Sequence, residues 1–148
     1  MSYRDLAFLN SFAPPHALDP YLQSTISKLN EIAPGIWDHL ERIEDLPTEA
    51  ARGVLSMFLE QACLCQNDGN IRIGRYGIGA LPQAWLLTNI EVAAESILSA
   101  GDPWVFRRLL EIYRYIDDGL MRKLAIRAVD DQDTEIQRCG REFLNLKR

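Results

Sequence analysis

Hydrophobic side chains recur every three or four residues along most of this chain, and no run of alternating strand residues stands among them. The clearest case follows Asp102-Pro103, where apolar residues share one helical face at Val105, Leu109, Ile112 and Ile116. Spacings of three and four are typical of amphipathic helices, whereas strict alternation is typical of strands. The pattern therefore predicts an all-α protein.

Residues that commonly begin helices punctuate this pattern. The dipeptides at 19–20 and 102–103 each combine an N-cap aspartate with a proline at the first helical position. The expected helix starts or caps are Asp19, Pro34, Thr48, Pro82, Asp102 and Asp133. The helix expected at about 49–66 is apolar nearly all round, which predicts a place at the centre of the core. Phe58 in its middle should be buried.

One short motif recurs. DPWVFR at 102–107 and DTEIQR at 133–138 share Asp-x-x-Val/Ile-x-Arg and lie 31 residues apart. A weaker copy, DGNIRI at 68–73, keeps the aspartate but has Ile73 in place of the arginine. Helix pairs that repeat at such periods are the signature of helical solenoids.

An Asp-capped helix with a Val/Ile-x-Arg start, followed by a second helix, resembles a HEAT repeat over roughly residues 67–148. The resemblance implies a short right-handed solenoid of about six to eight helices, with a concave face that binds another macromolecule. It implies no catalytic residue. Residues 1–66 lack the Asp/Arg signature, so their place in such a solenoid stays open.

The acid run near the C-terminus, DDQD at 130–133, admits two interpretations. Asp133 can cap the next helix, and its acidic neighbours favour the positive end of that helix. A binding role for Asp130, Asp131 and Asp133 is the alternative. The capping interpretation accounts for the run without a ligand and is preferred.

A chain of 148 residues matches one compact domain, and we expect a single domain over 1–148 with an irregular segment at 1–17. No stretch has the apolar length of a membrane span. The three cysteines form no evident disulfide framework, which favours the cytoplasm. No cofactor is expected.

The net charge of −5 belongs to the N-terminal half. Residues 1–66 hold nine acids and four bases, whereas residues 67–148 hold twelve of each. The acids are densest in the segment 38–49, DHLERIEDLPTE. Nucleic-acid binding needs a basic surface, so an acidic chain fits a basic protein partner better. The candidate partner-binding residues are Glu41, Glu44, Asp45 and Glu49.

A second candidate is the arginine cluster of the helix at 103–116. Arginine and tyrosine are frequent at the energetic centres of interfaces, so this cluster is a possible recognition site. The alternative is a network within the helix, in which the arginines share one glutamate. The residues concerned are Arg107, Arg108, Glu111, Arg114 and Tyr115.

Other motifs do not predict chemistry. GRYGIG at 74–79 lacks the spacing of a dinucleotide-binding loop and follows no strand, so its glycines are interpreted as sites of close helix packing or a turn. Cys63 and Cys65 have no nearby histidine that completes a metal site. His16 and His39 stand alone and are expected at the surface.

The preferred function is a non-catalytic protein-binding module. Bacterial immunity proteins, which neutralise a cognate toxin, are similar to this chain in size and acidity and are the specific hypothesis. The alternative is a HEAT-like enzyme or nucleic-acid repair factor that grips phosphates with the arginines between residues 72 and 141.

Overall fold

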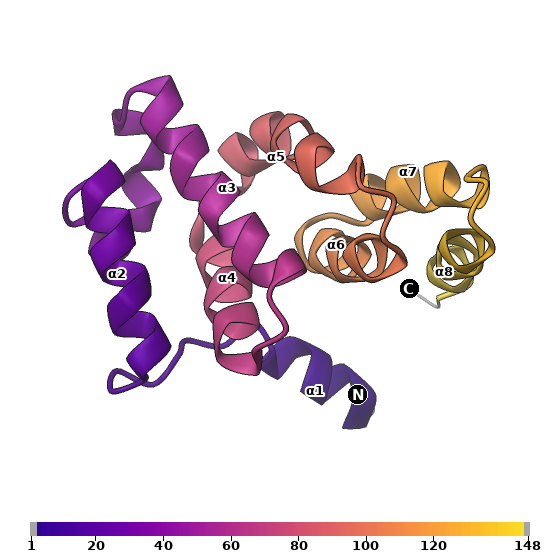
Figure 1. The fold of residues 1–148 in the computed structure, drawn as a ribbon, viewed down its shortest axis with the longest axis horizontal. Coiled ribbons are helices and arrows are strands. Elements are labelled where there is room, and N and C mark those ends of the chain that lie inside the picture. Colours follow the sequence, from indigo (N-terminus) through magenta and orange to yellow (C-terminus); the bar gives the residue numbers. More distant parts are fainter. Residues whose placement is uncertain (1–2, 147–148) are drawn as a thin grey trace. The chain divides into compact units, whose positions relative to one another are not determined.

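A computed structural model describes residues 3–146, and the side chains of residues 5–146. These residues form eight α-helices and one 3-10 helix, without a strand, as predicted (Figure 1). The elements are α1 (Tyr3–Asn10), α2 (Pro20–Ile32), the 3-10 helix η1 (Ile36–Asp45), α3 (Thr48–Leu64), α4 (Asp68–Ala80), α5 (Gln83–Leu98), α6 (Pro103–Ile116), α7 (Asp118–Val129) and α8 (Thr134–Leu144).

Aspartates begin several helices, as expected. The side chain of Asp19 accepts a hydrogen bond from the backbone N–H of Tyr21 at 2.8 Å, and Asp102 does the same for Trp104 at 2.9 Å. Asp133 accepts from the N–H of Glu135 at 2.8 Å. Such caps satisfy amide groups that the first helical turn leaves without partners.

The acid run at 130–133 forms the connection between α7 and α8. Asp130 ends α7, and the carboxylate of Asp131 accepts the N–H of Asp133 at 2.8 Å while Asp133 caps α8. The capping interpretation of Asp133 is confirmed. Nothing in these contacts calls for a ligand.

Three local expectations were wrong. The segment 1–17 is not wholly irregular, because α1 occupies Tyr3–Asn10. Thr48 is the first residue of α3 and makes no capping bond. The segment opened by Pro34 is a kinked 3-10 helix, with non-helical backbone angles at His39 and Arg42. The motif aspartate Asp68 is the first residue of α4, and Asn67 caps this helix.

The chain divides into two compact units, Met1–Ala94 and Glu95–Arg148. The division falls inside α5, whereas the sequence places the start of the HEAT-like part at residue 67. In the first unit α3 and α4 lie side by side, and α2 and η1 pack on both (Figure 1). In the second unit α6, α7 and α8 pack on one another.

The helix α3 is the centre of the first unit. Seven of its seventeen residues are buried, and the Phe58 side chain is completely buried, as predicted. The ring of Trp37 from η1 lies edge-on to Phe58 with centroids 6.2 Å apart. The nearly all-apolar sequence of this helix therefore reflects contacts on several sides.

Candidate binding surfaces

The acidic segment, residues 38–49, lies on η1 and the first turn of α3. Apolar residues at helical spacing hold it against the unit, since Ile36, Leu40 and Ile43 are all buried. All four predicted partner-binding residues are exposed on it: Glu41, Glu44, Asp45 and Glu49. The sequence therefore placed these acids correctly at the surface.

A tight turn positions this segment. Gly35 has φ +79°, a left-handed conformation that glycine adopts readily, and its N–H donates to Asn30 Oδ1 at 2.9 Å. At the other end, the N–H of Leu46 bonds back to the carbonyl of Ile43. The acids thus stand on backbone that is anchored at both ends.

Within the acidic segment, one arginine, Arg42, stands beside five acids. His39 Nδ1 lies 3.5 Å from Glu41 Oε1, in a pair that is ionic only when the histidine is protonated. Within residues 5–146, Glu44, Asp45 and Glu49 form no ion pair. The segment therefore presents several uncompensated negative charges to solvent.

The arginine cluster of α6 includes a contact with α8 that the sequence did not predict. Arg107 leaves its own helix to donate to Glu142 Oε2 of α8 at 2.8 Å, and this hydrogen bond raises the pKa of Arg107 further. Arg108 lies over the ring of Trp104, 5.5 Å from its centroid. Glu111 and Arg114 are half-buried on the same helix, and Tyr115 is exposed.

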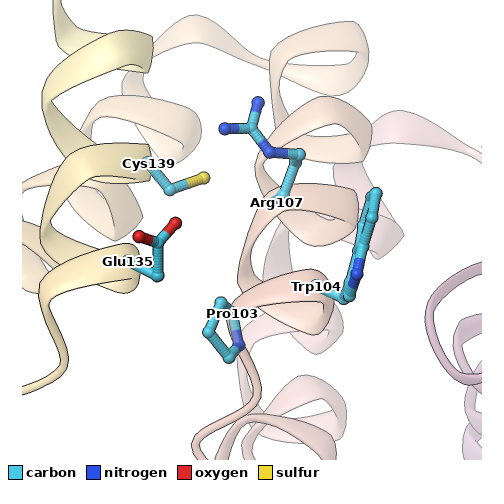
Figure 2. Close-up of a pocket in the computed structure, with 5 residues that line it drawn as sticks. All are labelled: Pro103, Trp104, Arg107, Glu135 and Cys139. Carbon is cyan, nitrogen blue, oxygen red and sulfur yellow. The ribbon is translucent and has the colours of Figure 1, made fainter.

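A hollow beside this cluster was not predicted. It has a volume of about 220 Å³ and is lined by Pro103, Trp104, Arg107, Glu135 and Cys139. Figure 2 shows α6 and α8 running in the same direction, so that the beginnings of both helices flank the hollow. The 31-residue motif spacing was the available signal, because it predicts that residues near 103 and 134 occupy equivalent positions.

Cys139 is a poor candidate for a nucleophile. Its side chain is buried, and burial raises the pKa of the thiol while Arg107 lowers it to a smaller extent. The thiol therefore keeps its proton at neutral pH, and the thiolate is the reactive form.

The other motifs take structural places. The glycines Gly74 and Gly77 of α4 lie against α3, as the packing interpretation of GRYGIG predicts. Both histidines are exposed, and His16 Nδ1 accepts the N–H of Leu18 at 3.1 Å. Among the residues described, no group of three or more potential ligands can hold a metal ion.

No helix within the described part of the chain is both long enough and apolar enough to cross a membrane. Comparisons with protein families, with curated proteins and with solved structures found no match to this chain.

Proposed function

We propose that this protein is a non-catalytic protein-binding module whose acidic segment docks a basic protein partner. The observation that carries the proposal is the set of exposed acids at Glu44, Asp45 and Glu49, which make no ion pair within the described residues. An acidic surface on one protein and a basic surface on the other attract each other. This attraction speeds the encounter of the two proteins and helps to select among partners.

The arginines support the alternative less well. Arg72 pairs with Asp68 at 3.0 Å, Arg107 with Glu142 at 2.8 Å, and Arg127 with Glu95. A phosphate-binding surface works through cations whose charge is available to the nucleic acid. Carboxylates beside these three arginines oppose that use, which favours a protein partner.

Two finer proposals accompany this one. We propose a HEAT-like helical repeat, supported by the Asp caps of α6 and α8 and by their shared direction in the second unit (Figure 2). We also propose that the partner is a basic toxin and the protein its cytoplasmic immunity partner. The size and acidity of the chain support that proposal, and its three cysteines are free thiols, as expected in a reducing compartment.

The experiment replaces Glu41, Glu44, Asp45 and Glu49 together with lysine. Partners are captured from native lysate, and association kinetics are then measured at two salt concentrations. The variant should keep its helical circular dichroism, because exposed charges contribute little to stability. It should associate more slowly, and salt should affect its association rate less than that of the wild type.

Two double variants with the same change of net charge test whether the position of the acids matters. Glu44→Lys with Asp45→Lys changes the charge as much as Glu31→Lys with Glu60→Lys, and all four side chains are exposed. Only the first double should slow association. If both doubles act alike, or if Arg107→Ala and Arg108→Ala abolish binding while the lysine variants keep it, the proposal is wrong.

A further inference from the structure

The hollow between α6 and α8 has oppositely charged groups on facing walls. Figure 2 shows the carboxylate of Glu135 and the thiol of Cys139 directed from α8 into the space between the helices, with the guanidinium of Arg107 reaching in from α6. Pro103 and Trp104, at the start of α6, complete the lining. The lining therefore includes one cationic and one anionic side chain.

Both charged groups can make further hydrogen bonds. Arg107 bonds to Glu142 through one terminal nitrogen, whereas a guanidinium carries five N–H donors. Glu135 lies 3.5 Å from Arg138, which is too long for a strong charge-assisted hydrogen bond, and its side chain is 59% exposed. One wall thus offers donors and the other offers acceptors.

The hollow carries charges of both signs. Arg107 lies on the α6 wall and Glu135 on the α8 wall, and Glu142, Glu111 and Arg138 lie near these two groups. A ligand with a net charge meets a group of its own sign on one wall. A neutral dipole with a donor at one end and an acceptor at the other suits both walls, and the peptide group is such a dipole.

The size of the hollow favours one residue of a chain. Pockets for small-molecule ligands usually measure about 300 to 1,000 Å³. This hollow, at about 220 Å³, is smaller. Beside it, Trp104 is 65% exposed and is covered in part by Arg108, and both residue types are frequent at protein interfaces.

We propose that the hollow between α6 and α8 binds the main chain of an extended segment of a protein partner. A peptide N–H donates to Glu135, and a neighbouring carbonyl accepts from Arg107. The inference rests on the proposed function only in taking the partner to be a protein. It does not use the acidic segment, so each proposal can fail without the other.

The test uses blocked tripeptides, acetyl-Gly-X-Gly-N-methylamide with X as Ala, Leu, Phe or Gln, titrated into the ¹⁵N-labelled protein. At least one should produce saturable shifts of the backbone amide signals of Glu135 and Cys139. The same peptide with methylated backbone nitrogens, which lacks the N–H donors, should bind at least fivefold more weakly.

Matched variants locate the site. Glu135→Ala should weaken binding at least fivefold, whereas Asp68→Ala should not change it, although each removes an acid from the first turn of a helix where it is paired with an arginine. An unchanged amide spectrum elsewhere shows that each variant is folded. Absence of saturable shifts with all four peptides, or equal binding by the methylated peptide or by Glu135→Ala, overturns the inference. If the lysine variants lose partner association but bind the peptide normally, both the proposed function and the inference about the hollow are supported.

Discussion

Phe58 shows how a single side chain organises the first unit. Its ring is completely buried, lies near Trp37 and occupies the space that a side chain at Gly77 would need, since a Cβ there would lie 2.6 Å from the ring. Three elements, η1, α3 and α4, therefore meet at this residue. Loss of the ring leaves a cavity that its neighbours can fill only in part.

Phe58→Ala should lower the free energy of unfolding by about 3 to 5 kcal/mol in urea unfolding followed by circular dichroism. Leu64→Ala on the same helix is the control, because Leu64 is 51% exposed. That change should cost less than about 1 kcal/mol. Similar losses for the two variants contradict the central place of Phe58.

Glu95 and Arg127 carry a second prediction at the residue scale. The two nitrogens of Arg127 bond to the two oxygens of Glu95, and this contact holds the pKa of Glu95 below its usual value of 4.5. The folded state therefore binds the proton of Glu95 more weakly than the unfolded state. The resulting stability is present above the unfolded pKa and is lost as the pH falls through the lower folded pKa.

Glu95→Gln should lower the stability by up to about 1 kcal/mol at pH 7, because both side chains are about half exposed. The difference from the wild type should shrink as the pH falls below about 4.5, which urea unfolding at several pH values measures. A difference that stays constant down to the lowest pH means that the pair is not responsible.

At the scale of elements, glycines set the closest helix contacts. A Cβ at Gly74 of α4 would lie 2.6 Å from the carbonyl oxygen of Phe58, and one at Gly140 of α8 would lie 2.6 Å from that of Ala125 in α7. Both obstacles are backbone, which cannot rotate away. In each pair, the two helices approach this closely because one of them has a glycine, which lacks a side chain, at the contact.

Gly140→Ala should therefore destabilise the protein by about 1 to 3 kcal/mol, as overpacking does. Gly53→Ala is the matched control, because its Cβ would meet only the side chain of Ile32 at an ordinary 3.5 Å. That exchange in a helix interior should stabilise by about 0.5 to 1 kcal/mol. Thermal unfolding measures whether each variant is less or more stable than the wild type. An unchanged or raised stability of Gly140→Ala contradicts the close contact.

At the scale of the whole molecule, charge governs what the protein attracts. The net charge is −5, and four replacements of an acid by lysine add eight, which gives +3. The wild type should show no binding to duplex DNA at physiological salt in an electrophoretic shift assay, because its net charge has the same sign as that of DNA. The quadruple lysine variant of the acidic segment should gain weak, salt-sensitive binding.

Tight DNA binding by the wild type that Arg107→Ala and Arg108→Ala remove supports the alternative function. The assay thus separates the two classes of partner without knowledge of the native partner. Circular dichroism spectra that match the wild type show that the variants keep their helical structure, so that differences in DNA binding reflect the change of charge.

Much of the local structure follows from neighbouring residues, and the sequence predicted it. Helical periodicity indicated the helices, and aspartate and proline located the starts of α2 and α6 because capping involves only residues within one turn. The errors at Thr48 and in η1 concern the same kind of short-range feature. In η1, His39 and Arg42 have non-helical backbone angles, and Ile36, Leu40 and Ile43 are buried against the core.

The same distinction, between features set by neighbouring residues and features set by tertiary packing, applies to the candidate sites. The sequence by itself determined that the acids at 38–49 are exposed, because charge and apolar spacing are properties of one short segment. Only the tertiary structure decided that Arg107 pairs with Glu142, 35 residues away, and that Glu135 and Cys139 face Arg107 across a hollow. Those contacts depend on how α8 lies against α6, and the direction and register of that packing arise from side chains far apart in the chain.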